Sequence, residues 1–194
     1  EPIDFFALPV DTTGDLNTGF AIVNPDDRSP VSLSFKLLDD SGQTVASRSI
    51  LLNPRNQTAQ YVVGTSQLFP NAQGVRGSLR VYSDSPVAAV ALRSSARTVT
   101  TVNPVAMNQS YDPVSLVFPQ IVAGSSGNYY RSSIILMNTG YLTVNGTIRF
   151  TRSDGTPMSV AIGQVTSAEH SFTIRPVSTL FLEASASRAL ESGY

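Results

Sequence analysis

The stretch Phe6–Val45, FALPVDTTGDLNTGFAIVNPDDRSPVSLSFKLLDDSGQTV, is the main guide to the organisation of this chain, because it recurs in altered form at Phe118–Met158, FPQIVAGSSGNYYRSSIILMNTGYLTVNGTIRFTRSDGTPM. Each copy has an apolar run, a Gly-containing loop, an apolar strand ending at asparagine, and a second strand before a glycine turn. The matched positions are Asn24 with Asn138, and Gly42 with Gly155. A repeat of about 110 residues suits a complete small β domain rather than a solenoid unit. The sequence therefore predicts an internal duplication.

The second copy ends earlier than the first along this alignment. In the first copy, the apolar segments Gly77–Tyr82 and Val87–Leu92 follow the shared part. In the second copy, the apolar Leu180–Leu182 is followed soon by Ser192–Tyr194. The alignment predicts that the second copy lacks the counterpart of residues 78–106.

The length, net charge and composition of the chain limit what kind of protein it is. Its length of 194 residues and the duplication predict two domains, residues 1–108 and residues 109–194. No apolar run approaches the ~18 residues of a membrane span, so we expect none. The net charge of −1 gives no general attraction to nucleic acid, so we expect no nucleic-acid partner. The absence of cysteine excludes disulfides and thiolate metal sites.

Charge is divided unevenly along the chain. Residues 1–40 hold eight acids and two bases, a balance of −6, and the remainder carries +5. This division favours head-to-tail contact between copies, although ordinary surface scatter produces the same numbers. The bases are almost all arginine, with Lys36 the exception. Lysine usually protects exposed edge strands, so its scarcity indicates either interfaces or a GC-rich genome.

Short strands separated by turn residues predict an all-β fold. The clearest strand is Val31–Leu38, where apolar and polar residues alternate with a period of two. Spacing of about ten residues between strands is typical of a sandwich or barrel. Other expected elements are a helical turn at Ser66–Phe69, a hairpin of Ser78–Tyr82 and Val87–Arg93, a domain boundary within Asn103–Pro113, a strand near Ser115–Val122 and weak helical propensity at Ala184–Glu191.

Catalytic and metal-binding patterns are largely missing. His170 is the single histidine, and no G-x-S-x-G nucleophile motif accompanies it, so we expect no enzyme. The acidic loop residues of the first copy are Asp11, Asp15, Asp26, Asp27, Asp39 and Asp40. They suit either calcium or, more simply, turns in which carboxylates bind their own backbone. We expect no cofactor and no metal site. Tyr129, Tyr130 and Arg131 form a candidate carbohydrate patch.

Several motifs resemble the immunoglobulin-like repeats of large secreted bacterial surface proteins. They are FPQIVAG at 118–124, SIILMN at 133–138, GTIRF at 146–150 and DGTPM at 154–158, with GFAIVNP at 19–25 and SDSPVAAVALR at 83–93 in the first copy. The resemblance implies two tandem immunoglobulin-like β-sandwich domains, located extracellularly or on a bacterial cell surface. In such repeats a terminal hairpin follows the glycine equivalent to Gly193. The start at Glu1 suits a chain whose signal peptide has been removed.

A sandwich without its last strands exposes core and unpaired backbone, so another strand must complete it. The predicted donor strand lies within residues 1–10, with Ile3, Phe5, Phe6, Leu8 and Val10 as inserted side chains. The predicted acceptor residues are Leu180, Phe181, Leu182 and Tyr194. This favours a structural subunit of a bacterial pilus or filament whose partners are copies of itself. Alternatives are part of a larger adhesin or scaffold, with host or cell-surface ligands, and a carbohydrate-binding module.

Overall fold

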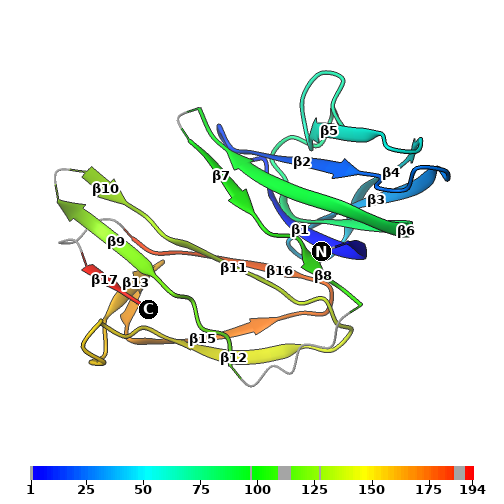
Figure 1. Cartoon of the computed structure of the whole chain (residues 1–194). Coiled ribbons are helices and arrows are strands. Elements are labelled where there is room, and N and C mark those ends of the chain that lie inside the picture. The colour runs from blue at the N-terminus through cyan, green and yellow to red at the C-terminus, as the bar shows by residue number, and fades with distance from the viewer. Residues whose placement is uncertain (1, 97, 109–114, 127, 186–190) are drawn as a thin grey trace. The chain divides into compact units, whose positions relative to one another are not determined.

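The computed structural model describes residues 2–96, 98–108, 115–126, 128–185 and 191–194. Every helix or strand element among them is a β-strand, which confirms the all-β prediction (Figure 1). The chain divides into two compact units: the first contains Glu1–Ser110 and Val177–Thr179, and the second contains Tyr111–Pro176 and Leu180–Tyr194. Each unit has its own apolar core.

The first unit is built from eight strands in two sheets. They are β1 (Ile3–Asp11), β2 (Asn17–Val23), β3 (Val31–Asp39), β4 (Thr44–Leu52), β5 (Gln57–Tyr61), β6 (Arg76–Ser94), β7 (Val99–Val102) and β8 (Val105–Ala106). One sheet has the order β4-β3-β6-β1-β8, and the other has the order β5-β2-β6-β7. Buried apolar side chains from both sheets form one core, as expected for a β-sandwich.

The period-two pattern of β3 is confirmed. Val31, Leu33, Phe35 and Leu37 are buried, and the residues between them are exposed. Because successive side chains of a strand point to opposite faces, this alternation turns one face of β3 toward the core. The Phe35 ring packs against Phe20 of β2, with ring centroids 5.3 Å apart.

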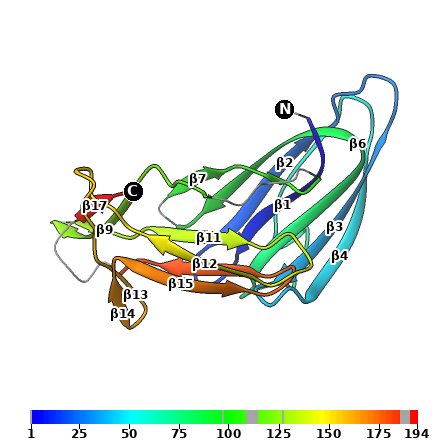
Figure 2. The same ribbon diagram turned by 90° about the horizontal axis from the view of Figure 1, so that it is seen from below.

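Strand β6 belongs to both sheets of the first unit. Its first half, Arg76–Ser83, pairs with β1 and β3, and its second half pairs with β2 and β7. Figure 2 shows the strand curving between the two. The predicted hairpin at Asp84–Pro86 is therefore wrong, because each half finds its partners in a different sheet. A proline, which has no N–H to donate, lies at the crossing, where ladder pairing changes.

Three local expectations also fail or fall outside the described residues. Ser66 has φ 61°, and Ser66–Phe69 forms turns rather than a helical turn. The strand expected near Ser115–Val122 begins only at Ile121. The domain boundary and the weakly helical segment include residues 109–114 and 186–190, which lie outside the described residues.

The second unit repeats part of the first. Its strands are β9 (Ile121–Ser126), β10 (Asn128–Tyr130), β11 (Ser133–Met137), β12 (Val144–Arg149), β13 (Val160–Ile162), β14 (Val165–Ser167), β15 (Glu169–Ile174), β16 (Thr179–Glu183) and β17 (Glu191–Gly193). Strand β12 pairs with β15, β11 with β16, and β9 with β10 and β17. Its core cluster consists of Ile121, Ile134, Phe150, Met158, Val160 and Ala184.

Two matched asparagines show that the duplication extends to hydrogen bonds. The Asn24 side-chain amide donates to the carbonyls of Ser29, Leu52 and Asn53 at 2.9, 3.3 and 3.2 Å. The Asn138 amide donates to the carbonyls of Leu142, Ile174 and Arg175 at 2.7, 3.2 and 2.9 Å. Each asparagine thereby ties the end of one strand to the end of another, β4 or β15. The matched turn glycines, Gly42 and Gly155, both have φ 86°.

Replacing Asn24 by alanine is expected to lower the free energy of unfolding of the first unit by about 2–3 kcal/mol. Asn24 is fully buried, and its loss leaves three carbonyls and the Asp26 N–H without this partner. Urea denaturation followed by circular dichroism measures the change. The control is Asn56→Ala, because Asn56 is exposed. Equal effects of the two substitutions would contradict this role of Asn24.

Candidate strand-exchange site

The structure places the predicted donor segment inside the first unit. Phe6, Leu8 and Val10 of β1 are 0% exposed and belong to the core of that unit. Strand β1 pairs with β6 along most of its length, and Phe6 and Ala7 also pair with β8. The segment is therefore an interior strand of its own sheet, and exchange of this strand between copies stays a prediction.

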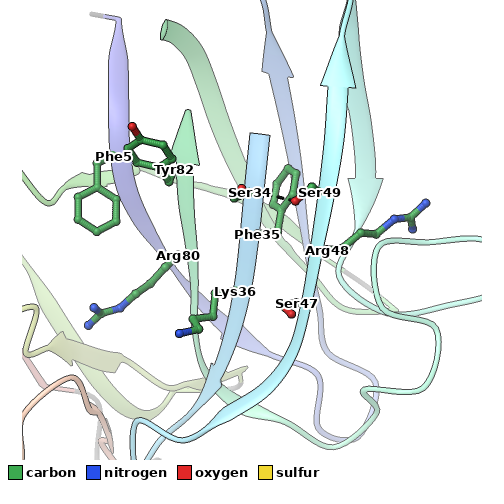
Figure 3. Close-up of a pocket in the computed structure, with 9 residues that line it drawn as sticks. All are labelled: Phe5, Ser34, Phe35, Lys36, Ser47, Arg48, Ser49, Arg80 and Tyr82. Atoms are coloured by element: carbon green, nitrogen blue, oxygen red, sulfur yellow. Dashed lines mark hydrogen bonds between the residues drawn. The ribbon is translucent and has the colours of Figure 1, made fainter. Parts of the chain in front are cut away.

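The other two predicted donor residues, Ile3 and Phe5, also lie in β1 but are only partly buried. Ile3 is partly buried and packs against the core. Phe5 lies on the outer face, where its ring is 6.3 Å from that of Tyr82 in an edge-on arrangement. Both rings line an open hollow of about 650 Å³ that also contains Lys36 and Arg80, which are register partners on β3 and β6 (Figure 3). This surface therefore combines two aromatic rings with two cationic side chains.

A buried carboxylate lies where β1 ends. The Asp11 side chain is 2% exposed, and its Oδ2 is 3.2 Å from Arg76 Nε and 3.2 Å from Arg93 Nη2. Its Oδ1 accepts hydrogen bonds from the N–H and hydroxyl of Thr13. Arg76 begins β6, and Arg93 is near its end. Asp11 thus binds both ends of the strand that crosses between the sheets.

The predicted acceptor residues lie in two different places in the second unit. Leu180, Phe181 and Leu182 are half-buried in β16, which pairs with β11. Strand β16 corresponds to β5, an outer strand of the first unit. Tyr194 is placed differently: its backbone N–H and carbonyl each form a 2.8 Å hydrogen bond with Thr151.

Strand β17 occupies the position at which β6 begins in the first unit. Gly193 pairs with Ile121 and forms a bridge with Arg152. Gly77 likewise pairs with Val10 and Asp39. In the first unit β6 continues from this point between its neighbours. Among the described residues of the second unit, no strand continues along β12 or along the free side of β11. We call this unfilled position the open lane.

Apolar residues line the open lane on two strands. Counting from the matched turn glycines, Ile148 of β12 corresponds to Phe35, and Phe150, the residue after β12, corresponds to Leu37. Counting from the matched asparagines, Ile134 and Leu136 of β11 correspond to Phe20 and Ile22. In the first unit all four counterparts are buried. The sequence prediction missed these residues, because the strands that neighbour β6 are known only from the structure of the first unit.

The other flank of the open lane is exposed and irregular. Leu116 and Val117 are 75% and 77% exposed, and Phe118 is 39% exposed. Because Ile121 takes the place of Val10 opposite glycine, Val117 rather than Phe118 corresponds to Phe6. The sequence match of Phe6 with Phe118 is therefore shifted by one residue. In the first unit, the corresponding segment is a strand paired to β6.

Chemical groups outside the open lane have structural roles. His170 Nε2 lies 3.0 Å from the Val160 carbonyl and 3.1 Å from the Ser167 carbonyl. Asp39 accepts hydrogen bonds from the Ser41 hydroxyl and from backbone N–H groups in its turn. The hydroxyl bond is the main cause that lowers the pKa of this carboxyl below its ordinary value. The described residues contain no cluster of three metal-binding side chains. The side chains of Tyr129 and Tyr130 lie outside the described part, and Arg131 pairs with Glu183 at 3.3 Å.

In the described part of the chain, no helix is long and apolar enough to cross a membrane. No family model matches the sequence, and no curated protein matches it. Among solved structures, the crystal structure of Thermotoga maritima 1070 is similar at a TM-score of 0.44 and 12% identity, over 54% of this chain and 94% of that chain.

Proposed function

We propose that this chain is a structural, non-enzymatic building block of an extracellular bacterial assembly, a filament or surface scaffold, joined to its neighbour by β-strand complementation. The observation that carries the proposal is the open lane, because the first unit has a buried strand at the same position. In this proposal both units are immunoglobulin-like sandwiches, and the second is completed by a strand from its neighbour.

The energetic case rests on what β6 contributes to the first unit. Leu79, Val81, Val87 and Ala91 of this strand are all 0% exposed. Full burial of one such Val or Leu side chain contributes about 1.5–3 kcal/mol, so this strand supplies stabilisation comparable to the total net stability of a small domain. Beside the open lane, Leu136 and Ile148 are only partly buried, whereas Ile134 and Phe150 belong to the buried core of the second unit. In this proposal a partner strand pairs with the backbone of β11 and β12 and covers the partly buried side chains.

In this proposal the donor is not β1 of a second copy, because β1 already pairs with β6 and β8 of its own unit. Withdrawing it would expose Phe6, Leu8 and Val10 and leave the first half of β6 paired on one side alone, with β3. Exchange would transfer the unfilled position from one unit to another without a net gain in buried surface. The proposal therefore keeps strand complementation and assigns the donor role to a strand other than Ile3–Val10.

A second candidate function is a tandem module of a larger adhesin or scaffold. It is favoured because the first unit is closed by its own β6 and needs no exchanged strand. In such a scaffold the complementing strand is part of the adjoining module, and self-association of residues 1–194 is not required.

Sedimentation velocity of residues 1–194 over a range of concentrations tests these functions. For a self-assembling subunit we expect association that increases with concentration, that Leu136→Lys weakens and that Tyr141→Lys leaves unchanged. Leu136 packs on the core at the open lane, whereas Tyr141 is 84% exposed in the same unit. A monomer whose β11 and β12 amides exchange rapidly would favour the tandem module. A monomer whose β11 and β12 amides are protected as well as those of β2 and β3 would overturn strand complementation in both forms.

A further inference from the structure

The outer face of β3, β4 and β6 in the first unit combines an exposed aromatic ring, an exposed cation and several hydroxyl groups. We propose that this face binds an acidic polysaccharide, a glycan whose sugars carry carboxylates, through Lys36, Tyr82 and the serines beside them. The inference goes beyond the proposed function, because it names a ligand for the first unit. It is also independent of the open lane, which lies in the second unit.

Two rows of side chains cross this face of the sheet (Figure 3). In the first row, Ser34 of β3 is the register partner of Ser49 on β4 and of Tyr82 on β6. In the second row, Lys36 of β3 is the register partner of Ser47 on β4. Side chains two residues apart on a strand point to the same face, so the two rows are neighbours about 7 Å apart along the strands. One ligand can therefore contact both rows.

Lys36 gives this face a positive charge. Its side chain is exposed, and none of the ion pairs among the described residues includes it. Its register partner on β6 is a second cation, Arg80, which has an interaction partner of its own, so only Lys36 is counted as a binding group here. None of the described residues that line the hollow is acidic. An exposed cation on a face without carboxylates attracts anionic ligands.

The second unit shows how the matched position is neutralised within the fold. Counting from the matched turn glycines, Arg149 corresponds to Lys36. Arg149 is the register partner of Glu169, and its Nε lies 2.8 Å from the Glu169 Oε1. The residue opposite Lys36 is Ser47. The first unit thus has a hydroxyl where the second has a carboxylate, so the place of that carboxylate is open to an anionic group of a ligand.

Tyr82 favours a sugar as the carrier of the anionic group. Tyr82 is 56% exposed, and the Phe5 ring supports it edge-on, with 6.3 Å between the ring centroids. The C–H face of a pyranose packs on such a ring, and its hydroxyl groups bond with serine hydroxyls, which both donate and accept. Ser34 and Ser49 supply two hydroxyls in the same row, with their Oγ atoms 3.5 Å apart. A sugar acid therefore has partners for its ring, its hydroxyls and its carboxylate on one face.

The place of this face within the sheet favours a glycan over a peptide strand. Strand β3 pairs with β4 and β6, and the first half of β6 pairs with β1 and β3. Their backbone groups are used in these ladders, so a peptide cannot dock here by adding a strand. The ligand must be held by side chains instead, and a flat, hydroxyl-rich ligand suits an aromatic ring flanked by a few polar groups.

Isothermal titration calorimetry of the intact chain with oligogalacturonate and oligomannuronate tests the inference. We expect saturable binding of at least one of them, and at least about tenfold weaker binding of its methyl ester, which has the same rings without the charge. Polyglutamate has the charge without the rings and is expected to bind at least about tenfold more weakly than the glycan. No saturable binding of either glycan, or equal binding of the methyl ester or of polyglutamate, would overturn the inference.

Three substitutions test the site itself. Ser47→Glu places opposite Lys36 the carboxylate that Glu169 supplies in the second unit, and it is expected to weaken glycan binding at least about tenfold. Lys36→Gln removes the cation and Tyr82→Ala removes the ring, and each is expected to weaken binding to a similar extent. Circular dichroism checks that each variant is folded. Unchanged binding in folded Ser47→Glu would contradict the role of Lys36.

The second unit supplies the controls. Arg149→Gln removes the matched charge, which is already paired with Glu169, and it is expected to leave glycan binding unchanged. Equal weakening by Arg149→Gln and Lys36→Gln would indicate general charge attraction and overturn the site. Leu136→Lys, which tests the open lane, is also expected to leave glycan binding unchanged, so this inference and the proposed function are tested separately.

Discussion

Gly77→Ala is expected to lower the free energy of unfolding of the first unit by at least about 3 kcal/mol. A Cβ at this position would lie 2.1 Å from the Leu38 carbonyl oxygen and 2.5 Å from the Asp39 carbonyl carbon. Both are backbone atoms of the neighbouring strand, so relief requires β3 and β6 to separate and their ladder to break. Thermal unfolding, combined with hydrogen exchange on β3 and β6, measures the loss.

Gly193→Ala provides the matched experiment in the second unit. A Cβ there would lie 2.2 Å from the Thr151 carbonyl oxygen. We expect it to increase exchange of β9 and β17 amides while leaving β3 and β6 unaffected. Gly74→Ala is the control, because no atom lies within 4 Å of its added Cβ and only its φ of 77° opposes the change, at about 1 kcal/mol. A Gly77→Ala effect no larger than that of Gly74→Ala would refute the close-approach argument.

Asp11→Ala is expected to destabilise the first unit by about 3 kcal/mol, the lower end of the range for breaking a buried ion pair. The substitution leaves Arg76 and Arg93 without this carboxylate, and their side chains are 31% and 24% exposed. Because water partly hydrates the two arginines, the expected loss of stability lies at the lower end of that range. Urea denaturation at neutral pH measures the change.

The control for Asp11 is Asp27→Ala. Asp27 also lies near two arginines, Arg28 at 3.6 Å and Arg55 at 3.4 Å, but its side chain is 51% exposed. Surface pairs of this kind contribute about 0–1 kcal/mol. If Asp27→Ala lowered the free energy of unfolding as much as Asp11→Ala, burial would not distinguish the two carboxylates. The argument that Asp11 links the two ends of β6 would then fail.

The sequence was sufficient to predict the features that depend on local chemistry. The alternation of β3 is predicted from its period-two pattern, and the structure confirms it. The duplication is predicted from the turn residues that the two copies share. The same patterns misplaced the hairpin at Asp84–Pro86. Apolar alternation on both sides of a proline fits a hairpin and fits equally well a strand that crosses between sheets, because partner choice is a long-range property.

The candidate site was harder to locate for a related reason. An apolar segment such as Ile3–Val10 shows the same order of apolar and polar residues whether it pairs within its own unit or with another copy. The pattern therefore does not identify the partner strand. The predicted acceptor residues are the last apolar run of the second copy, Leu180–Leu182, together with Tyr194. The strands that flank the open lane are β11 and β12, far earlier in the chain. Their role becomes visible only when the first unit reveals which strands are neighbours of β6.

The membership of β6 in both sheets has a consequence for the order in which the first unit folds. Strand β1 is made first, yet its main partner extends from Arg76 to Ser94. During synthesis, the apolar side chains of β1 therefore stay exposed to water until most of the unit has left the ribosome. Contacts between residues this distant in sequence slow folding and expose the nascent chain to misassembly. The unit is expected to fold in a single late step, when one strand closes both layers together.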